Sequence, residues 1–208
     1  MTPYPKFHRP SQLGFTLLET IVALAVILAA LVGPVALITR GIFDFSFAKN
    51  KITAANLAQE GIELVRAVRD NNIACDILNG PGSWPWNSDP EPPYPPTDHK
   101  FVNATAGIST DRTIAMDCGG INGASIIMPI LSTSCGEKLR FDSATGLYGY
   151  TGSQETIFSR CVTIKVPPDS PDAGIPAEDQ MDVVSTVTWD ERGAMKNMSL
   201  RERFYNWR

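Results

Sequence analysis

The stretch that decides the fold is Gly14-Phe15-Thr16-Leu17-Leu18-Glu19, which runs directly into an uncharged apolar segment from residue 20 to residue 39. A helix of about twenty residues, rising about 1.5 Å per residue, is roughly 30 Å long and matches the hydrocarbon thickness of a bilayer. The sequence therefore predicts one membrane-spanning helix. Glu19 stands at the start of this segment, where a carboxylate is costly and therefore indicates a functional role.

Two simpler interpretations of this N-terminus have to be weighed. A secretory signal peptide would explain the basic residues Lys6 and Arg9, but the apolar segment is longer than the usual run of about 7 to 15 residues. No small-x-small cleavage site follows Ile38 either. A plain signal anchor accommodates the span and leaves Glu19 without a role.

The hexapeptide resembles the processing site of type IV prepilins and of the pseudopilins of type II secretion. The resemblance implies that a prepilin peptidase cuts after Gly14 and that Phe15 becomes the N-methylated first residue. It also implies that Glu19 pairs with the amine of a neighbouring subunit during assembly. Residues 1–14 are then the leader, and the resemblance at this level covers residues 1–70.

A long N-terminal helix is expected over residues 15–70, with residues 16–39 in the membrane. Beyond residue 44, apolar side chains recur at three- and four-residue steps, which predicts an amphipathic face that docks on a sheet. Those side chains are Ile52, Ala55, Ala58, Ile62, Val65 and Val68. Pro34 is expected to kink the span, and Asn71-Asn72 to cap the helix. The stretch from Ala58 to Asn72 is similar to the exit helix of V-type minor pilins.

Residues 71–100 separate this helix from the rest of the chain and hold seven prolines between Pro81 and Pro96. Such a density of proline excludes a helix or a central strand, so the sequence predicts an extended surface loop. The loop carries Trp84, Trp86 and Tyr94. Two interpretations stay open for these aromatic residues: an exposed contact surface, or side chains that fold back onto the sheet.

Residues 101–208 show the period-two alternation of strands. Strands are expected over residues 113–116, 126–131, 138–141, 147–150 and 162–166, and in a final hairpin over 183–189 and 194–200. Pro129 places the second of these at an edge. An antiparallel sheet packed on the helix gives an α+β fold. Gly146-Leu147-Tyr148 and Val187-Thr188-Trp189 look like parts of the ectodomain of V-type pilus proteins.

The four cysteines are Cys75, Cys118, Cys135 and Cys161. Zinc sites usually need closely spaced pairs, which are absent here, so disulfides in an oxidising compartment are favoured over a metal site or unpaired core thiols. Cys118 and Cys135 bracket one strand and would close a short loop worth about 3 kcal/mol. We therefore expect a Cys118–Cys135 pair and a Cys75–Cys161 pair.

No enzyme is predicted, and no cofactor. Only His99 remains after a leader that contains His8, and the sequence has neither a phosphate-binding glycine loop nor a Gly-x-Ser-x-Gly motif. The acids between Asp169 and Asp182 form a solvated loop in the favoured interpretation and a calcium site in the alternative. A net charge of -4 argues against nucleic-acid binding.

These observations favour a filament subunit, most like a minor pilin. The expected partners are a prepilin peptidase, other pilin subunits, inner-membrane assembly machinery and the membrane. The expected location is the cytoplasmic membrane, with a single pass and an extracytoplasmic C-terminal domain, and then a surface filament. A type II secretion pseudopilin shares the N-terminal motif, and a monomeric membrane-anchored binding domain is the alternative of another class.

Overall fold

The computed structural model describes residues 14–88, 105–117, 125–132 and 135–206. These residues form one long helix, seven strands and a short 3-10 helix: α1 (Leu17–Asn79), β1 (Thr105–Asp117), β2 (Ser125–Ser132), β3 (Lys138–Asp142), β4 (Leu147–Gly149), β5 (Gln154–Lys165), η1 (Ala177–Asp179), β6 (Gln180–Glu191) and β7 (Ala194–Tyr205). The chain divides into two compact units, Met1–Ala48 and Lys49–Arg208. The expected α+β class is confirmed.

Helix α1 is longer than the sequence predicted. It passes Pro34 without a break in its helical assignment and ends at Asn79 instead of residue 70. The expected cap at Asn71-Asn72 is wrong because Asn72 is buried inside the helix and binds the loop that follows. The helix ends where Gly80 adopts a φ of 99°, a left-handed conformation that glycine reaches without steric cost.

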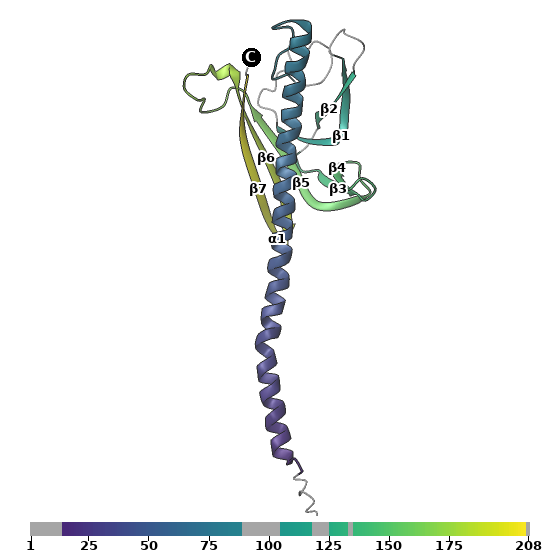
Figure 1. Cartoon of the computed structure of the whole chain (residues 1–208), viewed down its shortest axis with the longest axis vertical. Helices are drawn as coiled ribbons and strands as arrows, with labels where there is room; N and C mark the ends of the chain where they lie inside the picture. The colour runs from purple at the N-terminus through teal and green to yellow at the C-terminus, as the bar shows by residue number, and fades with distance from the viewer. Residues whose placement is uncertain (1–13, 89–104, 118–124, 133–134, 207–208) are drawn as a thin grey trace, which may run out of the picture. The chain divides into compact units, whose positions relative to one another are not determined.

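In the second unit, one face of α1 packs on the sheet (Figure 1). The predicted face is confirmed at Ala58, Ile62, Val65 and Val68, which are buried. The prediction that Ile52 belongs to this face is wrong, since 63% of its surface is exposed. The buried residues nearest to it along the helix are Ala54 and Leu57, so the apolar face begins two residues later than expected.

The sheet is antiparallel and centres on β5 and β6, which pair from Phe158 opposite Trp189 to Lys165 opposite Asp182. On its far side β6 pairs with β7 along its whole length. The other edge of β5 is shared, because β3 pairs with its first half and β1 with its second half. Strand β2 pairs only with β1 among the described residues, so the edge position predicted from Pro129 is confirmed.

The two hairpins predicted from turn sequences are both present. In the β6–β7 turn, Arg192 and Gly193 have φ values of 58° and 78°, and the Gly193 amide donates to Asp190 Oδ1 at 3.1 Å. Two successive positive φ angles suit a tight turn whose twist matches that of the strands. In the β3–β4 turn, the Gly146 amide donates to the Asp142 carbonyl at 2.8 Å.

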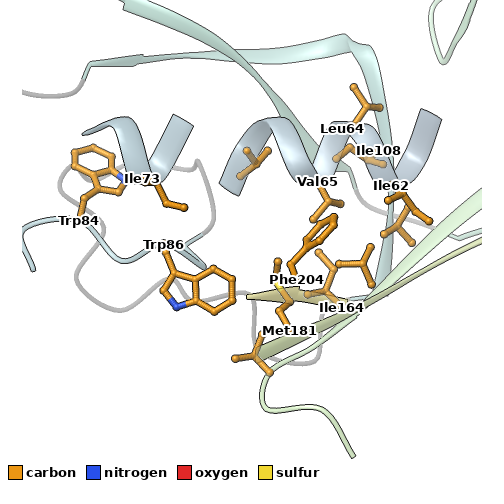
Figure 2. Packing of buried hydrophobic residues seen from close by; sticks show 14 of the residues in the cluster. Ile62, Leu64, Val65, Ile73, Trp84, Trp86, Ile108, Ile164, Met181 and Phe204 are labelled. Atoms are coloured by element: carbon orange, nitrogen blue, oxygen red, sulfur yellow. The ribbon is translucent and has the colours of Figure 1, made fainter. Parts of the chain in front are cut away.

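The core fills the space between α1 and the sheet, and Figure 2 shows part of it. Trp84 and Trp86 belong to this core, with 2% and 5% of their surfaces exposed. For these two residues the interpretation that the aromatic side chains fold back is therefore confirmed. Tyr94 lies outside the described residues.

Two polar side chains near the end of α1 hold the tryptophan segment in place. Asn72 Oδ1 accepts a hydrogen bond from the Trp84 indole at 3.1 Å, and Asn72 Nδ2 donates to the Ser88 carbonyl at 2.8 Å. Asp76 Oδ1 accepts from the Trp84 amide at 2.8 Å. These buried polar groups find partners in the loop and fix its path, as burial of polar atoms requires.

A close approach between α1 and the sheet depends on Gly61. A Cβ at this position would lie 2.4 Å from Ser185 Oγ and 3.1 Å from Arg160 Cδ, so a larger residue would push the helix away. Arg160 itself is fully buried, forms a 2.9 Å ion pair with Glu60 and donates to the Leu57 carbonyl at 3.1 Å. It also donates to the carbonyl of Ile108, and thereby joins β5 to both α1 and β1.

The disulfide pairing expected from loop length is wrong. Cys135 is bonded to Cys161, with their Cα atoms 4.9 Å apart. The cause is strand pairing, since Lys138 lies opposite Ser159 in the β3–β5 ladder and the residues before β3 therefore lie beside Cys161. Cys75 is also disulfide-bonded, and Cys118 lies outside the described residues.

Candidate processing and assembly site

Thr16 begins helix α1 as its N-cap. Its Oγ1 accepts a hydrogen bond from the Glu19 amide at 3.3 Å, and its carbonyl accepts from the Thr20 amide at 3.2 Å. A threonine followed three residues later by glutamate is the sequence pattern of a capping box. Glu19 therefore lies in the first turn, where the helix dipole favours a negative charge.

Gly14 has no structural reason to be glycine. A Cβ at this position would meet nothing within 4 Å, and its φ lies outside the left-handed range. Gly61 differs, because the close packing of the helix on the sheet leaves no room for a Cβ there. The next residue, Phe15, has 81% of its surface exposed and makes no contribution to the core.

The spacing of these residues has an electrostatic consequence. Phe15 and Glu19 are four residues apart, which is about 6 Å along a helix axis and close to one turn. Glu19 is the only acid between residue 14 and Asp44. A free amine at Phe15 would add a positive charge to the positive end of the helix dipole, and Glu19 is the nearest group that neutralises both.

The part of α1 that follows is a candidate membrane span by its length and composition. An eighteen-residue window near its N-terminus is strongly apolar, and none of it is buried within the folded chain. Large apolar side chains such as Leu24, Leu28 and Leu31 are more than half exposed. An apolar helix surface of this kind is stable only against lipid or against other helices.

Four of the acids considered as a calcium site, Asp169, Asp172, Asp179 and Asp182, are engaged with basic or amide side chains. Burial alone would raise the pKa of Asp182, but hydrogen bonds from Arg203 and Arg201 outweigh it and hold that pKa below its ordinary value. Arg203 Nη1 also donates to Asp172 at 2.7 Å, and Asn206 Nδ2 donates to Asp179 at 2.8 Å. Within the described ranges, no group of three acidic, cysteine or histidine side chains is arranged to hold a metal ion.

Sequence reasoning singled out Gly14, Phe15 and Glu19; Glu19 lies in the first turn of α1, and Gly14 and Phe15 lie just before the helix. It missed Arg160 and Asn72. The signal for Arg160 was available, because Arg160 shares the period-two alternation of Val162 and Ile164 and therefore faces the core. Asn72 carried no comparable signal, because its partners follow 12 to 16 residues later in the loop.

A family model described as the prokaryotic N-terminal methylation motif matches residues 9–33. No curated protein and no solved structure shows significant similarity to the chain. The matched region contains Gly14, Phe15 and Glu19 together with the first part of the apolar helix. The chain thus carries the N-terminal signature of the type IV pilin and pseudopilin family.

Proposed function

We propose that this chain is a subunit of a type IV pilus-like filament, and specifically a minor pilin. A prepilin peptidase removes residues 1–14, the new amine of Phe15 is methylated, and the apolar helix packs against those of other subunits. The observation that carries the proposal is the geometry at the start of α1: a glycine that the fold does not need, an exposed phenylalanine and an acid held in the first turn.

Cleavage explains why Gly14 is present. An enzyme that cuts the bond after this residue reads an extended backbone, and the absence of a Cβ lets that backbone approach closely. Packing of helices then explains Glu19. The Phe15 amine is charged, and a charge drawn into a bundle of apolar helices is strongly disfavoured unless it is paired. Glu19 supplies this partner, either to its own amine or to that of a neighbour displaced along the fibre.

The span keeps the subunit in the cytoplasmic membrane until inner-membrane assembly machinery moves it into the fibre. The Cys135–Cys161 disulfide supports an ectodomain outside the cytoplasm, because disulfides persist in oxidising compartments. The likeness of residues 58–72 to the exit helix of V-type minor pilins favours a pilus subunit over a type II secretion pseudopilin. Recovery of the chain in sheared surface fibres is expected for the pilus subunit. Recovery in the membrane fraction alone would favour the pseudopilin or the monomeric anchored domain.

The direct test compares Gly14→Val with Gly61→Val in a host that supplies the peptidase. For the wild-type chain, mass spectrometry should find a mature N-terminus at N-methylated Phe15. Gly14→Val should retain Met1 and keep a normally folded ectodomain, since the added side chain meets open space. Gly61→Val should be cut normally and lose ectodomain stability. Wild-type material that keeps Met1, or a Gly14→Val chain cut as efficiently as wild type, would refute the proposal.

A further inference from the structure

A cleft of about 460 Å³ opens in the ectodomain where the segment after α1 meets the end of β5 and the last residues of the described chain. Its apolar lining comes from Trp84, Pro85, Trp86, Val166 and Pro167. Gly82 and four polar residues complete the lining, the polar ones being Asn87, Glu178, Asp179 and Asn206. None of these residues belongs to the proposed processing and assembly site, which lies between residues 14 and 39.

Two amide side chains of the cleft have unused hydrogen-bonding atoms. Asn87 is only 5% exposed, and within the described ranges no hydrogen bond is formed by its side chain. Asn206 donates through Nδ2 to Asp179, but its Oδ1 is buried and without a partner among those residues. Buried amides are nearly always hydrogen-bonded in folded proteins, so the Asn87 amide marks the cleft as a place where a ligand supplies a partner.

The charge of the cleft defines the ligand further. Glu178 is exposed and contributes a carboxylate, and Asp179 has one carboxylate oxygen left after its bond with Asn206. No basic side chain lines this cleft in the part of the chain that the structure describes. Acceptor oxygens therefore dominate, and the ligand must bring donors and a positive charge.

A sugar is less suitable than a cation for this cleft. Carbohydrate rings usually stack on an exposed aromatic face, whereas Trp84 and Trp86 are only 2% and 5% exposed and leave little ring surface for stacking. An arginine side chain fits both features of the lining. Its aliphatic stem suits the apolar walls, and its planar five-donor fork serves several acceptors at once.

We propose that this cleft binds an arginine side chain presented by a partner peptide. Glu178 is the charge partner of the guanidinium, and the free oxygen of Asp179 accepts a further donor. The Asn87 amide is available to the peptide backbone beside it. The proposal is independent of filament assembly, so its failure would leave the assignment of residues 14–39 untouched.

The test uses the mature full-length chain in lipid nanodiscs and two small probes. N-acetyl-arginine amide carries the guanidinium, and N-acetyl-citrulline amide has the same shape without the charge. Saturation-transfer NMR should show that the arginine probe binds. The affinity for the citrulline probe should be lower by about fivefold or more. Raising the salt concentration should lower the affinity for the arginine probe and leave that for the citrulline probe nearly unchanged.

Glu178→Gln should reduce the affinity for the arginine probe by about fivefold, because it removes one exposed charge without changing the shape of the side chain. Glu155→Gln is the matched control, since Glu155 is also an exposed carboxylate but lies at the opposite end of β5 from the cleft. It should bind as wild type does. Equal binding of the two probes, no detectable binding of either, or wild-type affinity in Glu178→Gln would overturn the proposal.

Discussion

Glu60→Gln should destabilise the ectodomain because it leaves the charge of its buried partner, Arg160, uncompensated. The side chain of Arg160 is 0% exposed and that of Glu60 is 32% exposed, and the two form an ion pair of 2.9 Å. The change keeps the shape of residue 60 and removes only its charge. A fully buried guanidinium then has no charged partner and keeps only neutral acceptors, among them the carbonyl groups of Leu57 and Ile108.

The size of the effect follows from this geometry. Removing one partner of a buried pair costs about 3 to 5 kcal/mol, because the other charge stays buried without compensation. Two carbonyls still accept from Arg160, and water reaches Glu60, so we expect about 2 kcal/mol for this site. For a domain of this size that corresponds to a fall in Tm of about 4 to 8 °C.

The assay is thermal unfolding of the mature chain in detergent, followed by circular dichroism. Glu63→Gln is the matched control, because Glu63 lies three residues away and makes an ion pair with Arg66 in which the two side chains are 46% and 34% exposed. Its loss should cost less than about 0.5 kcal/mol. Adding Arg160→Met to Glu60→Gln should recover part of the stability, since it removes the uncompensated charge. Equal shifts in Glu60→Gln and Glu63→Gln, or a further loss in the double variant, would refute this reasoning.

Three further predictions concern the assembly site, the disulfide and the acidic loop. Glu19→Ala should be inserted and cut normally but enter sheared fibres about tenfold less or worse in cells without the wild-type copy; normal incorporation would show that the acid is incidental. Non-reducing peptide mapping should return Cys135 joined to Cys161, and removing this bond should cost about 3.5 kcal/mol for its 26-residue separation; a Cys118–Cys135 peptide would contradict the pairing. Asp182 has a folded-state pKa below its ordinary 3.8, so its ion pairs contribute stability above that pH and lose it as the pH falls through the folded-state value. Unfolding measured from pH 6 down to pH 2 should therefore show a loss that is smaller in Asp182→Asn, and identical slopes would contradict the assignment.

Features encoded by neighbouring residues could be predicted from the sequence. The hexapeptide from Gly14 to Glu19, the apolar span and the two hairpin turns each depend on contacts within a few positions. The structure confirms the hairpins and places Glu19 in the first turn of α1. Local pattern was sufficient because turn conformation and helix capping are decided locally.

Features that depend on distant pairing could not be predicted in the same way. The order of strands sets which cysteines meet, and no spacing rule contains the information that β3 lies beside β5. The predicted end of α1 was wrong for a related reason. Asparagine is a common helix terminator, but Asn72 stays helical because the segment around Trp84 provides its hydrogen-bond partners.

The side chain of Asn72 makes three hydrogen bonds, two donated and one accepted. Its oxygen accepts from Trp84, and its nitrogen donates to the carbonyls of both Trp86 and Ser88. Aspartate would lose both donated bonds and bring a charge into the core, and glutamine would be one methylene too long. Neither substitute keeps all three bonds while the loop keeps its path. In relatives of this chain, positions 72 and 84 should therefore be inherited as a pair, and a change at one without the other should mark a subunit whose tryptophan loop has been rebuilt.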